Sequence, residues 1–515
     1  MVPTFDLTKE PWLPCLGANG RPLELGLYDV LARAHELGGV AAATPLETAA
    51  IYRLLLALLH RVFPTPNARA WADLWRRGRW DEQALAAYLD RWRERFDLFH
   101  PERPFYQTRD DRIAPRSVAL LFPGMAAAAF YNHQAATQDL ALPPAAAARL
   151  LLVAQAYGLA GIAHPQLNLY FTSAPWLIGV VFLVEGDSLF QTLALNLLRY
   201  DERSPLQELC RTEEDKPAWE MDDPFSPERE VPAGYLDYLT WQNRRLRLIP
   251  EDLHGSLVVK RFTATPGLRL AMELRDPMKH YRRPTGPNQT GWRARSLDPR
   301  RALWRDSAAL LNLSDPDCRP PRVLEWLAGL VESCELDDSL RYRLLCFGML
   351  NDQGKGEMFR AERLPLPLAY LRDEALLSLL ATAVEHAEAK RADLAAALWL
   401  LARAFLSRGA DLEGGREPDP KDVRSLLAHW DAESAYWAEL ELPFLRLVDE
   451  LPGADGAEKL AEWRATVRRA AFGALAVAER LAGDGAEALK GAAQARRLLA
   501  ARLAEKAQVA TAANK

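Results

Sequence analysis

Short runs of acidic residues are the side chains in this 515-residue sequence that most resemble a centre for chemistry. The pairs Asp110-Asp111 and Asp222-Asp223 and the run Glu213-Glu214-Asp215 contain the oxygen ligands with which a divalent metal promotes hydrolysis. They lie in segments that contain prolines, where charged runs usually form solvated surface. We therefore expect no catalytic residue and no bound metal. A metal-dependent nuclease or hydrolase assembled from scattered acids remains the alternative.

The common sequence signatures of nucleotide binding and hydrolysis are absent. The chain contains neither a phosphate loop ending in Gly-Lys-Ser or Gly-Lys-Thr nor a Gly-x-Gly-x-x-Gly turn, and it lacks His-Glu-x-x-His and Gly-x-Ser-x-Gly. Its five cysteines are far apart and form no Cys-x-x-Cys pair, so we expect buried thiols rather than a zinc site or disulfides. The sequence favours a protein that binds or scaffolds and that uses no cofactor.

Composition predicts a globular protein of two or three domains, because 49% of the residues are hydrophobic and 26% are charged. The net charge of -5 gives no sign of a nucleic-acid-binding protein. A basic segment nevertheless lies at residues 279–305, where arginines far outnumber the single acidic residue, Asp298, so we expect a positive local field there. The chain begins without a signal peptide and has no apolar stretch long enough to cross a bilayer, which predicts a cytoplasmic protein without membrane contact.

Hydrophobic periodicity predicts mixed helix and strand in the first two thirds of the chain. The expected elements are helices at residues 45–63, 71–99 and 144–157, strands at 176–184 and 257–262, and loops at 105–141 and 201–232. Pro144 suits the first turn of the third helix, where its missing N–H is not needed.

Alanine and leucine dominate the sequence after residue 367, and helical periodicity is nearly unbroken there. Glycine- and proline-containing breaks divide this tail into four expected helices at residues 370–408, 420–451, 455–482 and 485–509. Long helices with short connections favour an antiparallel bundle. We therefore predict a mixed α+β N-terminal domain, residues 1–367, followed by an all-α four-helix bundle, residues 368–515.

Several stretches along the chain resemble one known family. They are residues 5–14 (FDLTKEPWLP), 27–36 (LYDVLARAHE), 54–60 (LLLALLH), 95–107 (RFDLFHPERPFYQ), 241–248 (WQNRRLRL) and 276–278 (DPM). Together with the helical tail, they are similar to the CasA family, the large subunit of the type I-E CRISPR Cascade complex. The resemblance covers essentially the whole chain, in order.

The resemblance implies a non-catalytic protein of antiviral defence that recognises the protospacer-adjacent motif (PAM) in double-stranded DNA and begins strand separation. Base pairing with the CRISPR RNA then tests the rest of the target sequence. The implied partners are the other Cascade subunits, the CRISPR RNA, the double-stranded target DNA and the helicase-nuclease that this subunit docks. A pure assembly scaffold that never touches DNA is a further alternative.

The first family element that the resemblance transfers is a loop that begins with an aromatic and an amide residue. Its counterparts here are Phe130, Asn132, His133 and Gln134. An aromatic ring can stack on a base, and amides can hydrogen-bond base edges or backbone. An ordinary polar loop with a buried Phe130 is the alternative.

The second element is a glycine turn beside the minor groove, where missing side chains let the backbone approach DNA closely. Gly158 and Gly161 correspond to it, although the family often has a denser glycine run and two glycines also suit a routine helix end.

The third element is a wedge hairpin that displaces the first base pair beside the motif. It corresponds to residues 348–354, with Gln353 as the wedge and Asp352 beside it. Some relatives carry Asn at the position of Asp352, and Lys355 is placed to offset the charge of this aspartate. A plain turn is the alternative, since Asn, Asp and Gly are common turn residues.

Two further basic positions complete the expected DNA-binding set. A lysine that reaches into the minor groove in relatives corresponds to Lys260 or to its neighbour Arg261. The last predicted helix carries Arg496 and Arg497, which suit phosphate contacts with the displaced strand. A solvated helix face is the alternative for this last pair.

Overall fold

The computed structural model describes residues 3–65, 67–110, 112–123, 140–158, 165–167, 174–200, 209, 211–284, 290–352, 355–407 and 417–504, without the side chains of 351–357. The chain divides into two compact units. The first comprises Met1–Pro299 and Leu313–Leu364, and the second comprises Arg300–Asn312 and Pro365–Lys515. From the sequence we expected the second domain to begin after residue 367. The structure also places residues 300–312 in the second unit.

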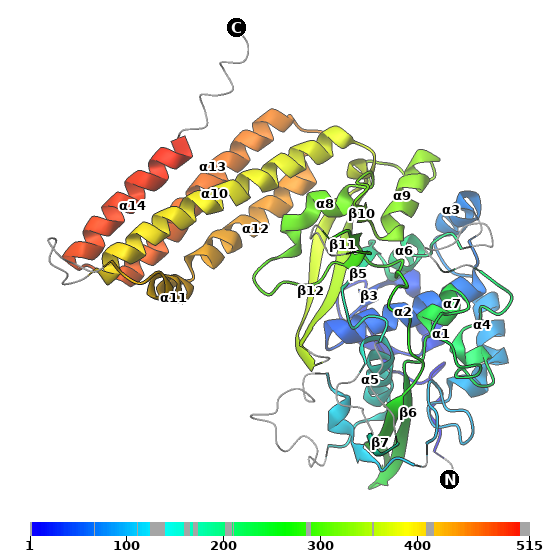
Figure 1. Ribbon diagram of the computed structural model, residues 1–515. Coiled ribbons are helices and arrows are strands. Elements are labelled where there is room, and N and C mark those ends of the chain that lie inside the picture. The colour runs from blue at the N-terminus through cyan, green and yellow to red at the C-terminus, as the bar shows by residue number, and fades with distance from the viewer. Residues whose placement is uncertain are drawn as a thin grey trace. The chain divides into compact units, whose positions relative to one another are not determined.

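The first unit mixes helices and short sheets (Figure 1). Its helices are α1 (Leu27–Ala32), α2 (Pro45–Val62), α3 (Ala68–Arg77), α4 (Glu82–Arg91), α5 (Pro144–Tyr157), α6 (Leu189–Leu195), α7 (Tyr235–Leu239) and α9 (Arg322–Glu332). Its strands are β1 (Leu13–Gly17), β2 (Pro22–Leu25), β3 (Leu37–Val40), β4 (Arg116–Ser117), β5 (Val180–Glu185), β6 (Arg244–Leu253), β7 (Ser256–Pro266), β8 (Tyr281–Arg282), β9 (Arg293–Ala294), β10 (Cys318–Arg319), β11 (Arg341–Asp352) and β12 (Lys355–Pro367). In the described parts of the chain they form three-stranded sheets with the orders β2-β1-β3, β4-β7-β6, β12-β11-β5 and β10-β8-β9.

Helix α2 is the buried centre of the first unit. Thr44 begins it as a capping box, because its hydroxyl accepts the backbone N–H of Glu47 at 3.2 Å and also contacts the Glu47 carboxylate at 3.3 Å. Nearly every residue of the helix is buried, as expected for a helix that is apolar around its whole circumference. Helices α5 and α7 and strand β11 pack against α2, so it links the elements discussed below.

Strands β6 and β7 form a long antiparallel hairpin that α5 covers. Its register runs from Arg244 opposite Pro266 to Leu253 opposite Ser256. The expected strand at 257–262 is confirmed but is longer, and β6 was not expected. The predicted helices at 45–63 and 144–157 are confirmed as α2 and α5.

The segment 71–99 is less continuous than its periodicity predicts. Gly78 ends α3 in the left-handed conformation, with φ of 68°, and Asp81 caps the start of α4 by accepting the backbone N–H of Ala84 at 3.0 Å. The expected loop at 105–141 contains the short strand β4 and a single 3-10 turn (Val118–Leu121) within its described part.

The second unit is helical (Figure 1). It contains α8 (Ser307–Leu311), α10 (Glu374–Leu406), α11 (Pro420–Trp430), α12 (Ala432–Glu450), α13 (Gly456–Ala482) and α14 (Ala486–Ala504). Helix α10 contacts each of the others, and α13 packs against α12 and α14. Asp431 adopts a left-handed conformation, with φ of 48°, and separates α11 from α12. The second of the four expected helices is therefore two helices, and a simple four-helix bundle is not confirmed.

The basic segment at residues 279–305 is not one positive surface. Lys279 is only 5% exposed. Arg301 and Arg305, which belong to the second unit, donate to Glu388 Oε1 at 2.7 and 2.6 Å. Burial and ion pairing thus weaken the positive field expected there, although Arg282, Arg283, Arg293 and Arg300 are exposed.

Among the described residues, no helix is both long and apolar enough to cross a membrane.

Candidate nucleic-acid interface

The β11–β12 hairpin is the element that carries the predicted wedge. β11 ends at Asp352 and β12 begins at Lys355, so only two residues connect these neighbouring strands. Such a short connection requires an antiparallel pair. Asp352 and Lys355 thus lie at the facing ends of the two strands, while Gln353 lies outside the described residues.

The end of the hairpin extends beyond the sheet that supports it. Strand β5 begins at Val180, whose partner on β11 is Gly348. β11 continues for four residues past this pair, which is roughly 13 Å at the rise of a strand. In Figure 1 the two strands form a narrow arm whose tip lies away from α9 and β10.

Gly348 fits β11 closely against its neighbours at the base of this arm. A β-carbon on Gly348 would lie 2.9 Å from Leu297 Cγ and 3.3 Å from a methyl group of Val180. Arg360 on β12 adds a polar contact on the other strand, since its guanidinium pairs with Glu362 at 2.8 Å and donates to the Asp298 carbonyl at 3.3 Å. Packing at the base therefore holds both strands of the arm.

The Asp276 carboxylate is hydrogen-bonded to the segment that leads into β5. It accepts hydrogen bonds from Trp176 Nε1 at 2.9 Å, from the hydroxyl of Tyr238 at 2.5 Å and from the backbone N–H of Met278 at 2.8 Å. The side chain is 2% exposed, so these bonds replace the water that the charge has lost.

Two buried cations accompany Asp276. Lys279 Nζ lies 3.8 Å from the carboxylate and donates to the carbonyls of Pro175 and Ile178, both at 2.7 Å. Burial lowers the pKa of Lys279, and Asp276 opposes that shift. The guanidinium of Arg53 lies over the ring of Trp176 at 5.1 Å and donates to the Tyr238 carbonyl. Three side chains, those of Asp276, Lys279 and Arg53, therefore hold residues 175–178 in place.

Gly158 ends α5 with φ of 81° and ψ of 179°, a conformation that is nearly restricted to glycine. Arg244 Nη2 lies 2.8 Å from the place that a β-carbon would take there. Arg244 is fully buried, donates to the Asn243 backbone carbonyl at 3.0 Å, and contacts the Asn243 side chain. Burial lowers the pKa of Arg244 to about 9. The predicted glycine turn therefore begins directly against a buried guanidinium.

Lys260 lies at the opposite end of α5 from Gly158. Its neighbour Val259 pairs with Leu142, just before α5 begins, whereas Arg244 and Gly158 lie where α5 ends. The 14-residue helix separates the two ends by roughly 21 Å. Arg261 is held by Glu251 at 3.0 Å. The structure does not bring either basic residue beside the glycine.

Arg496 and Arg497 are both exposed on α14 but differ in their contacts. Arg496 forms two hydrogen bonds with the Glu479 carboxylate, at 2.6 and 2.5 Å. Its charge is therefore largely compensated within the second unit.

The remaining predicted residues, Phe130, Asn132, His133, Gln134, Gly161 and Gln353, lie outside the described residues. Among the described residues, no group of three or more His, Cys, Asp or Glu side chains is arranged to hold a metal ion.

Asp215 is an exception to the surface loop expected at residues 201–232, whereas its neighbours Glu213 and Glu214 are exposed as expected. It is 4% exposed and caps α7, accepting the backbone N–H groups of Leu236 and Asp237 at 3.3 and 2.9 Å and the hydroxyl of Tyr200 at 2.8 Å. Burial raises its pKa to about 6. Leu209 and Trp219 of the same segment are also buried.

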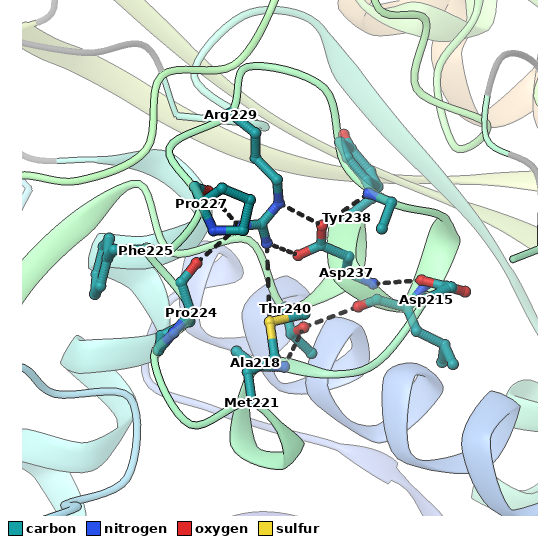
Figure 2. Close-up of polar contacts among 12 residues, drawn as sticks. Asp215, Ala218, Met221, Pro224, Phe225, Pro227, Arg229, Asp237, Tyr238 and Thr240 are labelled. Atoms are coloured by element: carbon teal, nitrogen blue, oxygen red, sulfur yellow. Dashed lines mark hydrogen bonds and ion pairs between the residues drawn. The ribbon is translucent and has the colours of Figure 1, made fainter. Parts of the chain in front are cut away.

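Arg229 completes this network, as Figure 2 shows. It donates to Asp237 at 2.7 and 3.1 Å and to the Pro224 carbonyl at 3.0 Å, and its guanidinium lies over Trp241 at 5.1 Å. The described residues of this segment have almost no regular structure and are held by buried polar contacts, which hydrophobic periodicity does not detect.

Arg244 and Asp276 were not assigned a role from the sequence, although both lie in stretches that carry the family resemblance. For Arg244 a signal existed, because the alternation of β6 places it on the same face as the buried Leu246 and Leu248. For Asp276 no local pattern distinguishes a buried carboxylate from a turn residue.

Comparisons with known proteins agree across the whole chain. The family model described as CRISPR-associated protein Cse1 matches residues 6–474. CRISPR-associated protein CasA/Cse1 of Thermus thermophilus is 32% identical over 506 residues, which cover 95% of each chain. The crystal structure of Cse1 from Acidimicrobium ferrooxidans matches with a TM-score of 0.80 and 28% identity, covering 97% of this chain and 98% of that one. The crystal structure of CasA from Thermus thermophilus matches with a TM-score of 0.79 and 29% identity, covering 97% and 99%.

Proposed function

This chain belongs to the CRISPR-associated Cse1 (CasA) family, and on that premise we propose that it is the motif-reading large subunit of a type I-E RNA-guided surveillance complex. It recognises the PAM on duplex DNA, starts strand separation, and recruits a helicase-nuclease that does the cutting. Its partners are the other subunits, the CRISPR RNA and the target DNA. It makes and breaks no covalent bond itself.

The observation that carries this proposal is the β11–β12 arm, which extends four residues past Val180 and ends in a two-residue connection. A side chain that separates a base pair must be held rigidly, because unstacking costs a few kcal/mol per step. The close fit of Gly348 against Leu297 and the Arg360 contact with Asp298 supply that rigidity at the base. Gln353 at the tip is the wedge, flanked by Asp352 and Lys355.

The glycine turn that begins at Gly158 contributes the second contact. The buried guanidinium of Arg244 supports the backbone of this buried glycine from inside the protein, and the β-carbon of Ala174 lies 3.2 Å from the place that a β-carbon of Gly158 would take. A backbone without side chains can approach a minor groove closely. On the family resemblance alone, we also assign DNA contacts to Gly161, Phe130, Asn132, His133 and Gln134.

Basic residues supply the sequence-independent part of the affinity. Lys260 on β7 contacts the duplex, and Arg497 on α14 contacts a phosphate of the displaced strand, with Arg496 contributing less because Glu479 pairs with it. The net charge of -5 predicts weak binding by the isolated chain, so tight binding requires the assembled complex.

The decisive experiment is a gel-shift titration of the reconstituted complex on duplexes that differ only in the flanking motif. The Gln353→Ala complex should lose most of the preference for the correct motif, whereas Gln83→Ala, which alters an exposed glutamine on α4, should keep it. If complexes lacking this subunit discriminate as well as the intact complex, the subunit is only an assembly scaffold. If the Gln353→Ala complex does so, Gln353 is not the wedge. Cleavage of DNA by the purified chain with Mg²⁺ would indicate a nuclease instead.

A further inference from the structure

Two of the stretches that carry the family resemblance meet at one pocket in the first unit. Residues 95–109 form one wall, and Gln242 and Arg245 of the stretch 241–248 form another. A third wall comes from Ala218, Trp219 and residues 222–224. The cavity has a volume of about 270 Å³, which is suited to a small ligand rather than to a duplex. It shares no residue with the proposed motif-reading surface.

Four arginines line this cavity, namely Arg95, Arg103, Arg109 and Arg245, together with three carboxylates, those of Glu102, Asp222 and Asp223, and we call it the arginine pocket. Burial lowers the pKa of the half-buried Arg95, and the nearby charge of Arg103 lowers it further. Arg247, beside Arg109, has its pKa lowered by burial and by that neighbour. Like charges held this close favour an anion between them.

Asp222 partly takes the place of such an anion. Its carboxylate lies 3.3 Å from Arg95 and 3.2 Å from Arg103, yet 91% of the side chain is exposed. An exposed carboxylate held only by ion pairs is easily displaced, because such pairs contribute little stability in water. A phosphate, which accepts several charge-assisted hydrogen bonds, competes well for the two guanidinium groups.

Two residues that line the pocket each carry a buried polar atom that makes no hydrogen bond among the described residues. These atoms are Gln242 Oε1 and the hydroxyl of Tyr106, on side chains that are 4% and 6% exposed. A buried carbonyl oxygen without a donor costs free energy, so a ligand with an N–H or O–H group would be stabilised there. Tyr106 also has an uncommon φ of 54°.

The walls of the pocket are fixed before any ligand enters. The backbone N–H of Ala218 donates to Thr240 at 2.9 Å, and Arg229 holds the Pro224 carbonyl (Figure 2). On the opposite wall, Gln107 donates to the Leu98 carbonyl at 2.7 Å and accepts the N–H of Leu248 at 2.8 Å. A preorganised site loses little conformational entropy on binding.

We propose that the arginine pocket binds a single nucleotide, with the phosphate between Arg95 and Arg103 and a base or sugar donor on Gln242 Oε1. The ligand must combine an anion with a hydrogen-bond donor, and a nucleotide does so. The same chemistry is offered by a free mononucleotide and by one nucleotide of an RNA strand. An acidic peptide, whose carboxylates lie near backbone N–H groups, is the competing ligand that the test below distinguishes.

The test uses the purified full chain and calorimetric titration at low salt with AMP, adenosine and inorganic phosphate. AMP should bind at least tenfold more tightly than either fragment. Arg103→Gln should weaken AMP binding about tenfold or more, as expected for loss of a charge-assisted contact. Arg33→Gln is the matched control, because Arg33 is equally exposed (48% against 50%) and pairs with an exposed carboxylate elsewhere in the unit.

Two further variants separate ligand binding from a structural role. Asp222→Asn removes the competing carboxylate and should tighten AMP binding severalfold, a gain that no purely structural role of Asp222 predicts. Gln242→Met should weaken AMP binding about tenfold and leave phosphate binding unchanged. A hexameric oligoadenylate that binds more tightly than AMP identifies an RNA strand as the source, and equal affinity identifies the free nucleotide.

Three results would overturn the proposal: no AMP binding above that of Arg103→Gln, equal affinities for AMP and phosphate, or displacement of AMP by a triglutamate peptide at lower concentrations than by oligoadenylate. The last would identify an acidic protein segment as the ligand. Each of these results leaves motif recognition by the β11–β12 arm untouched, so the two proposals fail independently.

Discussion

Arg244 Nη2 lies 2.8 Å from the position that a β-carbon would occupy on Gly158. A glycine with a backbone conformation that other residues avoid is thus packed against one of the most deeply buried charges in the described chain. The end of α5 and the start of β6 are joined by this contact, and by Gln155, which exchanges two hydrogen bonds with the Arg244 backbone at 2.9 and 3.0 Å.

Gly158→Ala should therefore lower the free energy of unfolding by about 3 kcal/mol, from backbone strain together with displacement of the Arg244 guanidinium. Gly78→Ala is the control, since Gly78 has φ of 68° but nothing within 4 Å of its missing β-carbon. It should cost only about 1 kcal/mol, the strain alone. Urea unfolding of both variants measures the difference, and equal losses would show that Arg244 moves aside freely.

Asp276→Asn should destabilise the first unit by about 3 kcal/mol, because Lys279 and Arg53 then lack their buried counter-charge. Amide hydrogen exchange at residues 175–178 should become faster, since Lys279 holds two carbonyls of that segment. The exposed Asp187 supplies a matched Asp187→Asn control with little expected effect. Unchanged exchange would mean that backbone packing alone holds the segment.

Asp215 makes the stability of the first unit depend on pH, and the direction of the change follows from its raised pKa. Burial raises its folded pKa to about 6 from the model-peptide value of 3.8. Between pH 4 and 6 the folded protein keeps a proton that the unfolded chain has released, so this group's contribution to stability falls as the pH rises, by about 3 kcal/mol in total. Below pH 4 the contribution is fully present.

Asp215→Asn removes this titration while keeping a side-chain oxygen to cap α7. Relative to the variant, the wild-type chain should therefore lose stability between pH 4 and 6 and show a constant difference above pH 7. Urea midpoints across this range measure the difference. A wild-type advantage that grows with pH would contradict the buried, proton-retaining carboxyl.

Arg497→Ala should reduce the slope of log affinity for target DNA against log salt by about one in the assembled complex, without altering motif preference. Arg496→Ala should reduce it less, because Glu479 already compensates that charge. The two adjacent residues serve as controls for each other. No effect of either variant would remove α14 from the DNA-binding surface, and equal reductions would show that Glu479 does not compensate the charge of Arg496.

Sequence patterning predicted α2 and α5 well because each is a long run of mostly apolar residues, most of them buried, and Pro144 marks the start of α5. It failed at Asp431, where a single left-handed residue divides one expected helix, since aspartate adopts this conformation only occasionally. It failed also at residues 201–232, because the contacts that bury Asp215 and Arg229 join residues distant in sequence. Pairings of that kind have no local signal.

For the candidate site, the resemblance located the hairpin between β11 and β12, and the structure adds what supports it. The contact of Gly348 with Leu297 depends on which strand lies beside β11, and no periodicity reports that. The same limit applies to the arginine pocket, whose walls come from three separate stretches of the chain.

The excursion of residues 300–312 has a practical consequence for dissecting the protein. Trp304 packs against Trp437 and Phe444, and Glu388 receives both Arg301 and Arg305. A fragment cut at residue 365 would leave behind these aromatic and basic partners of α10 and α12. No single cleavage point therefore yields an intact C-terminal piece, and a self-sufficient version requires the 300–312 peptide to be grafted onto it or supplied as a separate strand.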